Sequence, residues 1–190
     1  MKEIIQMIVV LSVICTVCGL GLSGVRDMTA ERIENQVLMN VQGPKVKLVL
    51  EGADNDLIAD RKKIKIKDEE ILLFMGKKKD KLWAIAYESM GGGFGGDLKV
   101  MVGYDLDKNK MTGIQIIDHK ETPGVGSKVT EDQFTKMFKG LDLDTNFAIK
   151  SDGGNIDGIT GATYSSRGVS EAIQKSIALF PEIKKMIPKQ

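Results

Sequence analysis

The strongest constraint on the fold is an apolar run near the beginning of the chain. Residues 4–22 contain no charged side chain and a single amide, Gln6. A helix of about 20 apolar residues is long enough to cross the hydrocarbon core of a bilayer. A cleaved signal peptide is the alternative, but residues 19–24 offer only a poor cleavage site. We therefore expect residues 1–25 to form a membrane anchor that stays attached to the protein.

The charges that flank this run say little about its orientation. Lys2 precedes it, whereas Arg26 and Arg32 follow it among acidic neighbours, so the positive-inside rule barely favours either orientation. Beyond the run, apolar residues recur at helical spacing, and Gly43-Pro44 is a pair that ends helices. Residues 26–44 are therefore expected to form a helical stalk between membrane and domain.

Composition argues against several classes of site. Basic and acidic residues are interspersed at a net charge of +1, unlike the basic stripe of a nucleic-acid-binding protein. Cys15 and Cys18 lie in the apolar run, where we interpret them as small hydrophobic residues. His119 is the only histidine, so a His/Cys metal site would lack a second ligand outside that run. We expect no metal site and no catalytic Ser-His-Asp or Cys-His group, and a hydrogen-bonding role for His119.

Residues 45–190 are expected to form one α+β domain. Alternating apolar residues predict a short strand at 64–66 and two hairpins, which pair 70–75 with 82–87 and 98–104 with 111–117. The segment 46–51 fits either a strand or a continued helix. The expected architecture is a twisted, mainly antiparallel sheet with a few flanking helices.

Two helices are predicted in the second half of the domain. The sequence from Thr130 to Gln133 has the pattern of a capping box, which would open a helix ending near Phe138. The final helix is expected to span about residues 165–179, with Lys175 and Ser176 facing outwards. Pro181 should stop or kink it because proline lacks a backbone N–H.

A glycine-rich segment, M-G-G-G-F-G-G, runs from Met90 to Gly96. Gly91, Gly93 and Gly96 satisfy the pattern G-x-G-x-x-G, but a dinucleotide-binding site requires a helix to follow it. Here a strand pattern follows, so we reject that interpretation. The glycines are expected to allow unusual φ angles or the close approach of a neighbour, either a flavin or another strand.

The densest cluster of small and hydroxylated residues extends from Asp152 to Ser170 and leads into the last helix. A loop that enters a helix presents unpaired N–H groups and a partial positive charge. Such a junction favours a bound phosphate. The alternative is that the Ser and Thr residues only cap the helix.

Residues 157–165, D-G-I-T-G-A-T-Y-S, resemble the flavinylation motif of the FMN-binding domain family, Asp-Gly-x-(Thr/Ser)-Gly-Ala-Thr-x-(Ser/Thr), at every defined position. The resemblance implies that Thr163 carries FMN through a phosphoester bond. It also implies a separate flavin transferase that uses FAD and magnesium. Arg167 is a candidate partner for the phosphate. The residues implied in cofactor binding are Thr160, Gly161, Ala162 and Ser165, and those implied in transferase recognition are Asp157, Gly161, Ala162 and Thr163.

A second segment, residues 119–126, resembles the wording H-x-E-T-P-G-L-G of the same family, with Val125 in place of the usual leucine. In that family this loop packs on the flavin ring. Without the resemblance, the same residues would indicate an ordinary strand-to-helix turn. The residues implied to line the ring are Glu121, Thr122, Pro123, Gly124, Val125 and Gly126.

The layout of one anchor and one domain is similar to that of the G subunits of Rnf electron-transport complexes, which are related to the C subunits of sodium-translocating NADH:quinone reductases. The resemblance implies an electron-carrier subunit of an ion-translocating ferredoxin:NAD oxidoreductase that relays electrons through covalent FMN. The domain would lie on the extracytoplasmic side, with other subunits and the flavin transferase as partners. Two alternatives stay open: a membrane-anchored FMN-binding sensor or scaffold, and a structural anchor subunit without a cofactor.

Overall fold

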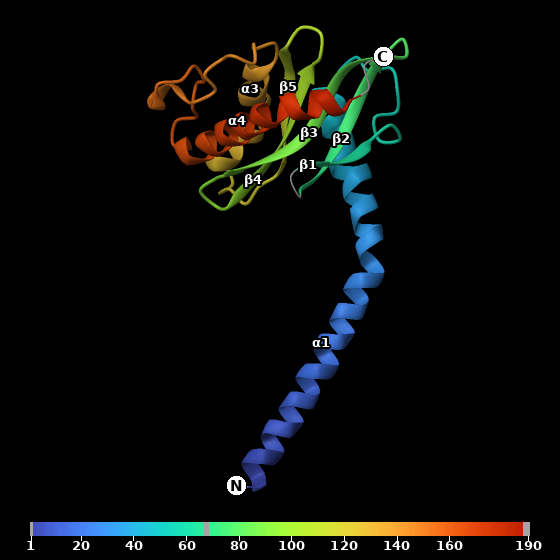
Figure 1. Cartoon of the computed structure of the whole chain (residues 1–190). Coiled ribbons are helices and arrows are strands. Elements are labelled where there is room, and N and C mark those ends of the chain that lie inside the picture. The colour runs from blue at the N-terminus through green and yellow to red at the C-terminus, as the bar shows by residue number, and fades with distance from the viewer. Residues whose placement is uncertain (1, 67–68, 188–190) are drawn as a thin grey trace. The chain divides into compact units, whose positions relative to one another are not determined.

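The computed structural model describes residues 2–66 and 69–187, and the chain divides into two compact units between Asn40 and Val41. The first unit contains α1 (Lys2–Val37), drawn in blue in Figure 1. Its apolar part has the length and composition to cross a membrane, and none of that part is buried in the protein. This unit is consistent with membrane anchoring.

The helical conformation does not end at Gly43-Pro44, as the sequence predicted. A π-helical segment, η1 (Leu38–Gln42), leads into α2 (Gly43–Val49), and Pro44 lies in the first turn of α2. Gln42, directly before α2, also has α-helical backbone angles, so Pro44 stands where the π-helical segment changes to the α-helix and not at a free helix end. The segment that fitted either strand or helix is therefore helical, with Val46 and Val49 buried.

The second unit is built on a five-stranded antiparallel sheet in the order β1-β2-β3-β4-β5. Each strand pairs with the next one along the chain, so the sheet is a meander. Both predicted hairpins and the short first strand are present, and the α+β class is confirmed. The strands are β1 (Lys62–Ile66), β2 (Glu69–Lys78), β3 (Lys81–Gly92), β4 (Asp97–Asp105) and β5 (Lys110–Asp118).

Helices flank both faces of this sheet. α2 contacts β4 and β5, and Gly103 of β4 leaves room for Val49. α4 (Thr163–Met186), red in Figure 1, contacts β3 and β4. The strand residues that pack against α4 alternate with the strand residues that face α2. It continues past Pro181, because Phe180 and Ile183 on either side of the proline are buried in the core and hold the helical path.

The predicted helix at 130–138 is present from Asp132 to its expected end at Phe138, within a series of short helical segments. They are η2 (Gly126–Thr130), α3 (Asp132–Thr135) and η3 (Lys136–Phe138), and a further turn, η4 (Lys150–Asp152), precedes the motif loop. The predicted capping box is wrong: Glu131 is the N-cap residue and makes no side-chain cap. The Thr130 hydroxyl donates a 2.8 Å hydrogen bond to the Ser127 carbonyl within η2.

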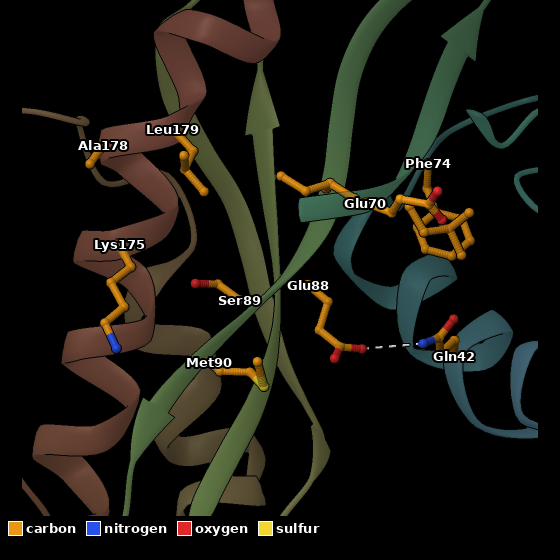
Figure 2. Close-up of a pocket in the computed structure, with 11 residues that line it drawn as sticks. Gln42, Glu70, Phe74, Glu88, Ser89, Met90, Lys175, Ala178 and Leu179 are labelled. Carbon is orange, nitrogen blue, oxygen red and sulfur yellow. Dashed lines mark hydrogen bonds between the residues drawn. The ribbon is translucent and has the colours of Figure 1, made fainter. Parts of the chain in front are cut away.

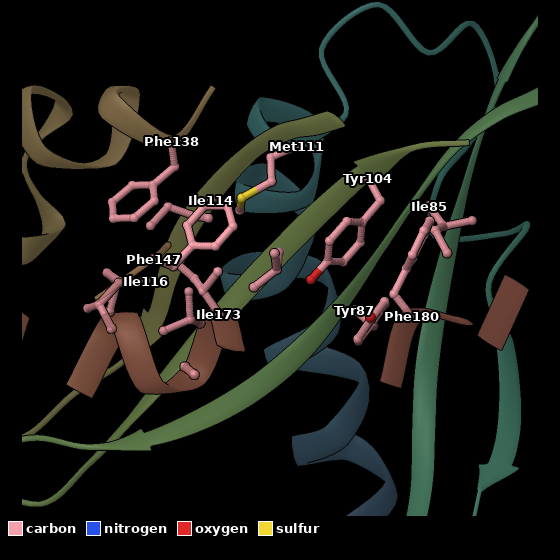
Figure 3. Close-up of a cluster of buried hydrophobic side chains, with 14 of the residues drawn as sticks. Ile85, Tyr87, Tyr104, Met111, Ile114, Ile116, Phe138, Phe147, Ile173 and Phe180 are labelled. Atoms are coloured by element: carbon pink, nitrogen blue, oxygen red, sulfur yellow. The ribbon is translucent and has the colours of Figure 1, made fainter. Parts of the chain in front are cut away.

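The core lies between α4 and the facing side of the sheet (Figure 3). At its centre the rings of Tyr87 and Tyr104 stack at 5.4 Å. The Tyr104 hydroxyl donates to Ser176 Oγ at 2.6 Å, and the Tyr87 hydroxyl donates to the Ser176 carbonyl at 2.7 Å. Burial raises the pKa of both phenols, so both stay protonated and able to donate. The expectation that Ser176 faces outwards is therefore wrong, because this hydroxyl satisfies a buried tyrosine.

We predict that Ser176→Ala lowers the free energy of unfolding by about 1–3 kcal/mol, because the buried Tyr104 hydroxyl loses its acceptor. The matched control is Ser170→Ala on the same helix. Ser170 is also buried, but its hydroxyl has no hydrogen-bond partner among the described residues, so its removal should be neutral or stabilising. Urea unfolding of the full chain in detergent, followed by Trp83 fluorescence, measures both. Equal losses in the two variants would contradict this assignment.

Candidate functional site

The first wall of the candidate site is the loop that enters α4. Gly161 adopts a φ of +82°, and the Ala162 N–H donates to the Ile159 carbonyl at 2.9 Å. Ser166 Oγ accepts from the Ile159 N–H and donates to the Ala162 carbonyl, each at 3.0 Å. The N-cap residue of α4 is Ala162, which has no hydroxyl, and no side chain caps the helix. The cluster of hydroxyls is therefore not explained by capping, and Thr163 stands at the first position of α4.

The second wall is the loop after β5. The Glu121 N–H donates to His119 Nδ1 at 3.2 Å, which gives the histidine a hydrogen-bonding role within this loop. The Thr122 carbonyl accepts from the Ser127 N–H at 3.2 Å. Gly124 has a φ of +75°, and its N–H donates to Ser127 Oγ at 2.9 Å. Pro123 and Gly124 therefore shape the turn, while their neighbours face the site.

Glu121 joins the walls of the site. Its side chain is only 5% exposed although it is a carboxylate. Oε2 accepts a 2.5 Å hydrogen bond from the Ser165 hydroxyl on α4, and Oε1 accepts a 3.0 Å bond from the Gly95 N–H in the turn between β3 and β4. A buried carboxylate needs such donors, because leaving it without partners would cost several kcal/mol. Three segments far apart in the sequence are thereby held on one side chain.

The glycines around Glu121 provide the space for its carboxylate. A Cβ on Gly93 would overlap Glu121 Oε1, and one on Gly126 would overlap Oε2. A Cβ on Gly95 would overlap the Lys120 carbonyl oxygen. The glycine-rich segment therefore makes the expected close approach, but its neighbour here is the loop after β5 and not another strand.

These walls enclose a cavity of about 400 Å³. Two exposed aromatic rings flank it: Phe94 is 74% exposed, Tyr164 is 62% exposed, and their centroids are 6.2 Å apart. The lining residues are Phe94, Glu121, Thr122, Val125, Gly126, Gly161, Ala162, Thr163, Tyr164 and Ser165.

Most of the residues implied in cofactor binding by the two motifs thus meet at this cavity, with three exceptions. Pro123 and Gly124 do not line it, and Thr160 lines a separate cavity of about 390 Å³ together with Asp157. The sequence interpretation missed Phe94 and Tyr164. Phe94 is the one large side chain within the glycine run, and Tyr164 occupies the undefined position of the motif, so each carried a weak signal.

Arg167 was the candidate partner for a phosphate, but it forms a bidentate pair with Asp152, at 2.6 and 2.7 Å. This hydrogen bond lowers the pKa of Asp152 and raises the pKa of Arg167. A phosphate on Thr163 would have to compete with that carboxylate for the guanidinium. Asp157 is likewise paired, with Lys150 at 2.7 Å.

The cavity fits a flavin nucleotide by its size and its chemistry. Its volume lies within the roughly 300–1,000 Å³ typical of ligand sites. The exposed faces of Phe94 and Tyr164 suit a planar aromatic ring. Next to Tyr164 in the first wall, Thr163 places a hydroxyl at the N-terminus of a long helix, where a phosphate is favoured. These residues could therefore hold both ends of FMN.

Comparison with known proteins points to the same cofactor. Residues 93–178 match the model of the FMN-binding domain. The chain is 28% identical over 194 residues to the G subunit of the ion-translocating oxidoreductase complex of Shewanella loihica, covering 94% of this chain and 90% of that protein. It is 29% identical to the protein of the same name from Stutzerimonas stutzeri, covering 88% and 76%. The match to the Buchnera aphidicola protein of that name spans 58% of its length at 29% identity.

Two solved structures share the fold. The crystal structure of the C subunit of the Na(+)-translocating NADH-quinone reductase from Parabacteroides distasonis is 25% identical, with a TM-score of 0.52 over 64% of this chain and 65% of that chain. NqrC from Shewanella oneidensis is 22% identical, with a TM-score of 0.52 over 72% of this chain and 73% of that one.

We predict that Gly126→Ala destabilises the domain by about 1–3 kcal/mol, because the new Cβ would overlap the Glu121 carboxylate and force the surrounding residues to move. Gly158→Ala is the control. It lies in the motif loop without a positive φ, and its Cβ would meet only ordinary contacts at 3.6 Å and beyond, so its stability should change by less than about 1 kcal/mol. Urea unfolding of both variants tests this. A neutral Gly126→Ala would show that the packing around Glu121 is loose.

Proposed function

This chain contains an FMN-binding domain and is homologous to the G subunits of ion-translocating oxidoreductase complexes, and from that premise we propose that it is an electron-carrier subunit of such a complex. In this proposal the complex is a ferredoxin:NAD oxidoreductase of the Rnf type. The chain relays electrons through FMN that is bound covalently to Thr163.

One observation carries the proposal. Thr163 begins α4 and lines the same cavity as the Glu121 loop and the two exposed aromatic rings. A phosphoester at this position would keep its negative charge next to the unpaired N–H groups and the positive end of the helix dipole. The ring would then reach the cavity from a short tether.

Bound FMN supplies one- and two-electron transfer, and the protein positions and tunes it. Phe94 and Tyr164 would cover the faces or edges of the ring and exclude water from it. Glu121 would act as a positioning residue, because it holds the β3–β4 turn and α4 together. It stays bound to the Gly95 N–H and the Ser165 hydroxyl and is not proposed to exchange protons.

Attachment requires a separate flavin transferase that uses FAD. Thr163 Oγ would attack the phosphorus on the FMN side of FAD, the phosphoanhydride bond would break, and AMP would leave while the hydroxyl proton passes to solvent or an enzyme base. Asp157, Thr160 and Gly161 are exposed, so the motif loop is accessible to a second protein. Small residues at 161 and 162 leave room for an incoming active site.

We predict that Thr163→Ala gives a folded protein without covalent FMN when it is coexpressed with a flavin transferase. Thr160→Ser is the control, because the motif accepts either hydroxyl at this position and the residue lines the other cavity, so the covalent flavin should be retained. Fluorescence in denaturing gels and mass spectrometry of the peptide that contains Thr163 measure both. A yellow Thr163→Ala protein after denaturation, or an adduct located on Ser165, would overturn the assignment.

Phe94→Ala should shift the visible absorption of the bound flavin and leave the covalent bond in place, because the ring contact and the attachment residue are on different segments. Phe138→Leu is a control for general loosening, since Phe138 is buried in the core and does not line the cavity. An unchanged flavin spectrum in folded Phe94→Ala protein would place the ring elsewhere.

We further propose that residues 1–25 stay attached as the anchor, that 26–44 form the stalk, and that residues 45–190 lie on the extracytoplasmic side. This assignment rests on the exposed apolar helix and on the family resemblance. With an epitope tag at each end, protease added to spheroplasts should destroy the C-terminal tag and leave the N-terminal tag in the membrane fraction. A protected C-terminal tag contradicts the orientation, and loss of the N-terminal tag from untreated cells contradicts the uncleaved anchor.

A further inference from the structure

The sheet forks between β2 and β3. Their register ends at Leu73 opposite Tyr87, but β2 continues to pair with β1 as far as Glu69, and β3 continues to pair with β4 as far as Gly92. A cavity of about 680 Å³ lies in this fork. Figure 2 shows Glu88 and Met90 on β3, with Lys175 of α4 on one side and Glu70 of β2 on the other.

Packing holds the fork open. The end of β3 is drawn against α4, since a Cβ on Gly91 would overlap the Gly168 carbonyl oxygen. The Gly92 N–H donates to Glu171 Oε2 of α4 at 3.0 Å. The facing part of β2 is held by β1 instead. Because the two strands are fixed by different neighbours, they cannot close on each other.

The free edges of both strands face into the fork. The Gly93 N–H donates to the Gly96 carbonyl at 2.9 Å. In an antiparallel pair, every second residue of a strand bonds to the partner strand, and the residues between them direct their N–H and C=O to the other side. Gly91 therefore bonds to β4, whereas Met90 directs its N–H and C=O away from β4. Ala86, like Met90, directs its backbone groups away from β4 and towards its partner Phe74 on β2. Glu70 lies four residues before Phe74, so its backbone groups also point towards β3. No described strand pairs with these two edges beyond Leu73 and Tyr87.

Such edges are templates for an added strand. The walls also offer apolar contact from Leu72 and Leu179, and Met90 is 52% exposed. Two carboxylates, Glu70 and Glu88, line the cavity against a single cation, Lys175, which already pairs with Glu171 at 2.7 Å. Glu88 forms an ion pair with Lys99 at 3.7 Å and accepts a 3.2 Å hydrogen bond from Gln42 Nε2, so an added basic side chain would share this carboxylate.

We propose that this fork is the docking site for an extended segment of another polypeptide, which adds as a short strand between β2 and β3. The segment carries alternating apolar side chains and at least one Lys or Arg for the two carboxylates. The ends of β2 and β3 that do not pair with each other, residues 69–72 and 88–92, are four and five residues long, so the fork accepts four to five residues. None of the residues that line the fork lines the flavin cavity, so the docking site is independent of the proposed cofactor function.

The test uses the full chain in lipid nanodiscs as the target for a phage library of random heptapeptides. Selected peptides should be rich in β-branched residues and contain a basic residue. Met90→Pro removes the N–H that faces the fork without touching the β4 ladder. It should weaken binding about threefold to tenfold relative to Met90→Ala, because both variants lose the side chain and only the proline loses the backbone donor.

Two further measurements complete the test. N-methylation of alternate peptide amides should abolish binding. Glu70→Gln should weaken the binding of basic peptides and reduce the salt dependence of that binding. Thr163→Ala protein should bind the selected peptides like the wild type, which separates this site from the flavin.

The proposal is wrong if no peptide is selected or if binding is insensitive to Met90→Pro and N-methylation. It is also wrong if hydrogen exchange at Met90 and Glu70 slows on addition of lipid alone or with rising protein concentration, since a lipid or a second copy would then occupy the fork.

Discussion

The candidate site depends on the buried carboxylate of Glu121. Its two oxygens take hydrogen bonds from the Ser165 hydroxyl and the Gly95 N–H, which belong to segments that are remote from each other in the sequence. Burial of a carboxylate is unfavourable unless its partners are in place. The β3–β4 turn, the loop after β5 and the start of α4 therefore have to assemble together. The cavity beside Thr163 exists because this condition is met.

α4 connects this site to the core. Its first turn carries Thr163 and Ser165, its middle presents Ser176 to two buried tyrosines, and its later residues Phe180 and Ile183 keep it helical past a proline. Since the core fixes the position of the helix on the sheet, it also fixes where the threonine hydroxyl stands. Stability and cofactor geometry are in this way consequences of the same packing.

β3 has a similar double role. Its end is held against α4 by Gly91 and Gly92, which opens the fork on one side. The chain then turns through Gly93 and Gly95 to reach Glu121 on the other side. The glycines of this segment serve close packing at both places. A docking surface and a cofactor cavity can thus lie at one end of a single strand without sharing a lining residue.

The sequence by itself determined the features that depend on neighbouring residues. The uncharged run specifies a long apolar helix, alternation specifies the two hairpins, and the motif before the last helix locates the loop that contains Thr163, because each of these is local geometry. Tertiary structure decided which side chains meet. It continued the helix through Pro44 by way of a π-helical segment, and it turned Ser176 into the core, where a tyrosine needs an acceptor. It also brought Phe94 and Tyr164 to one cavity and left Pro123, Gly124 and Thr160 outside it. These outcomes depend on contacts between distant segments, which satisfy buried polar groups and fill space in ways that no local pattern records.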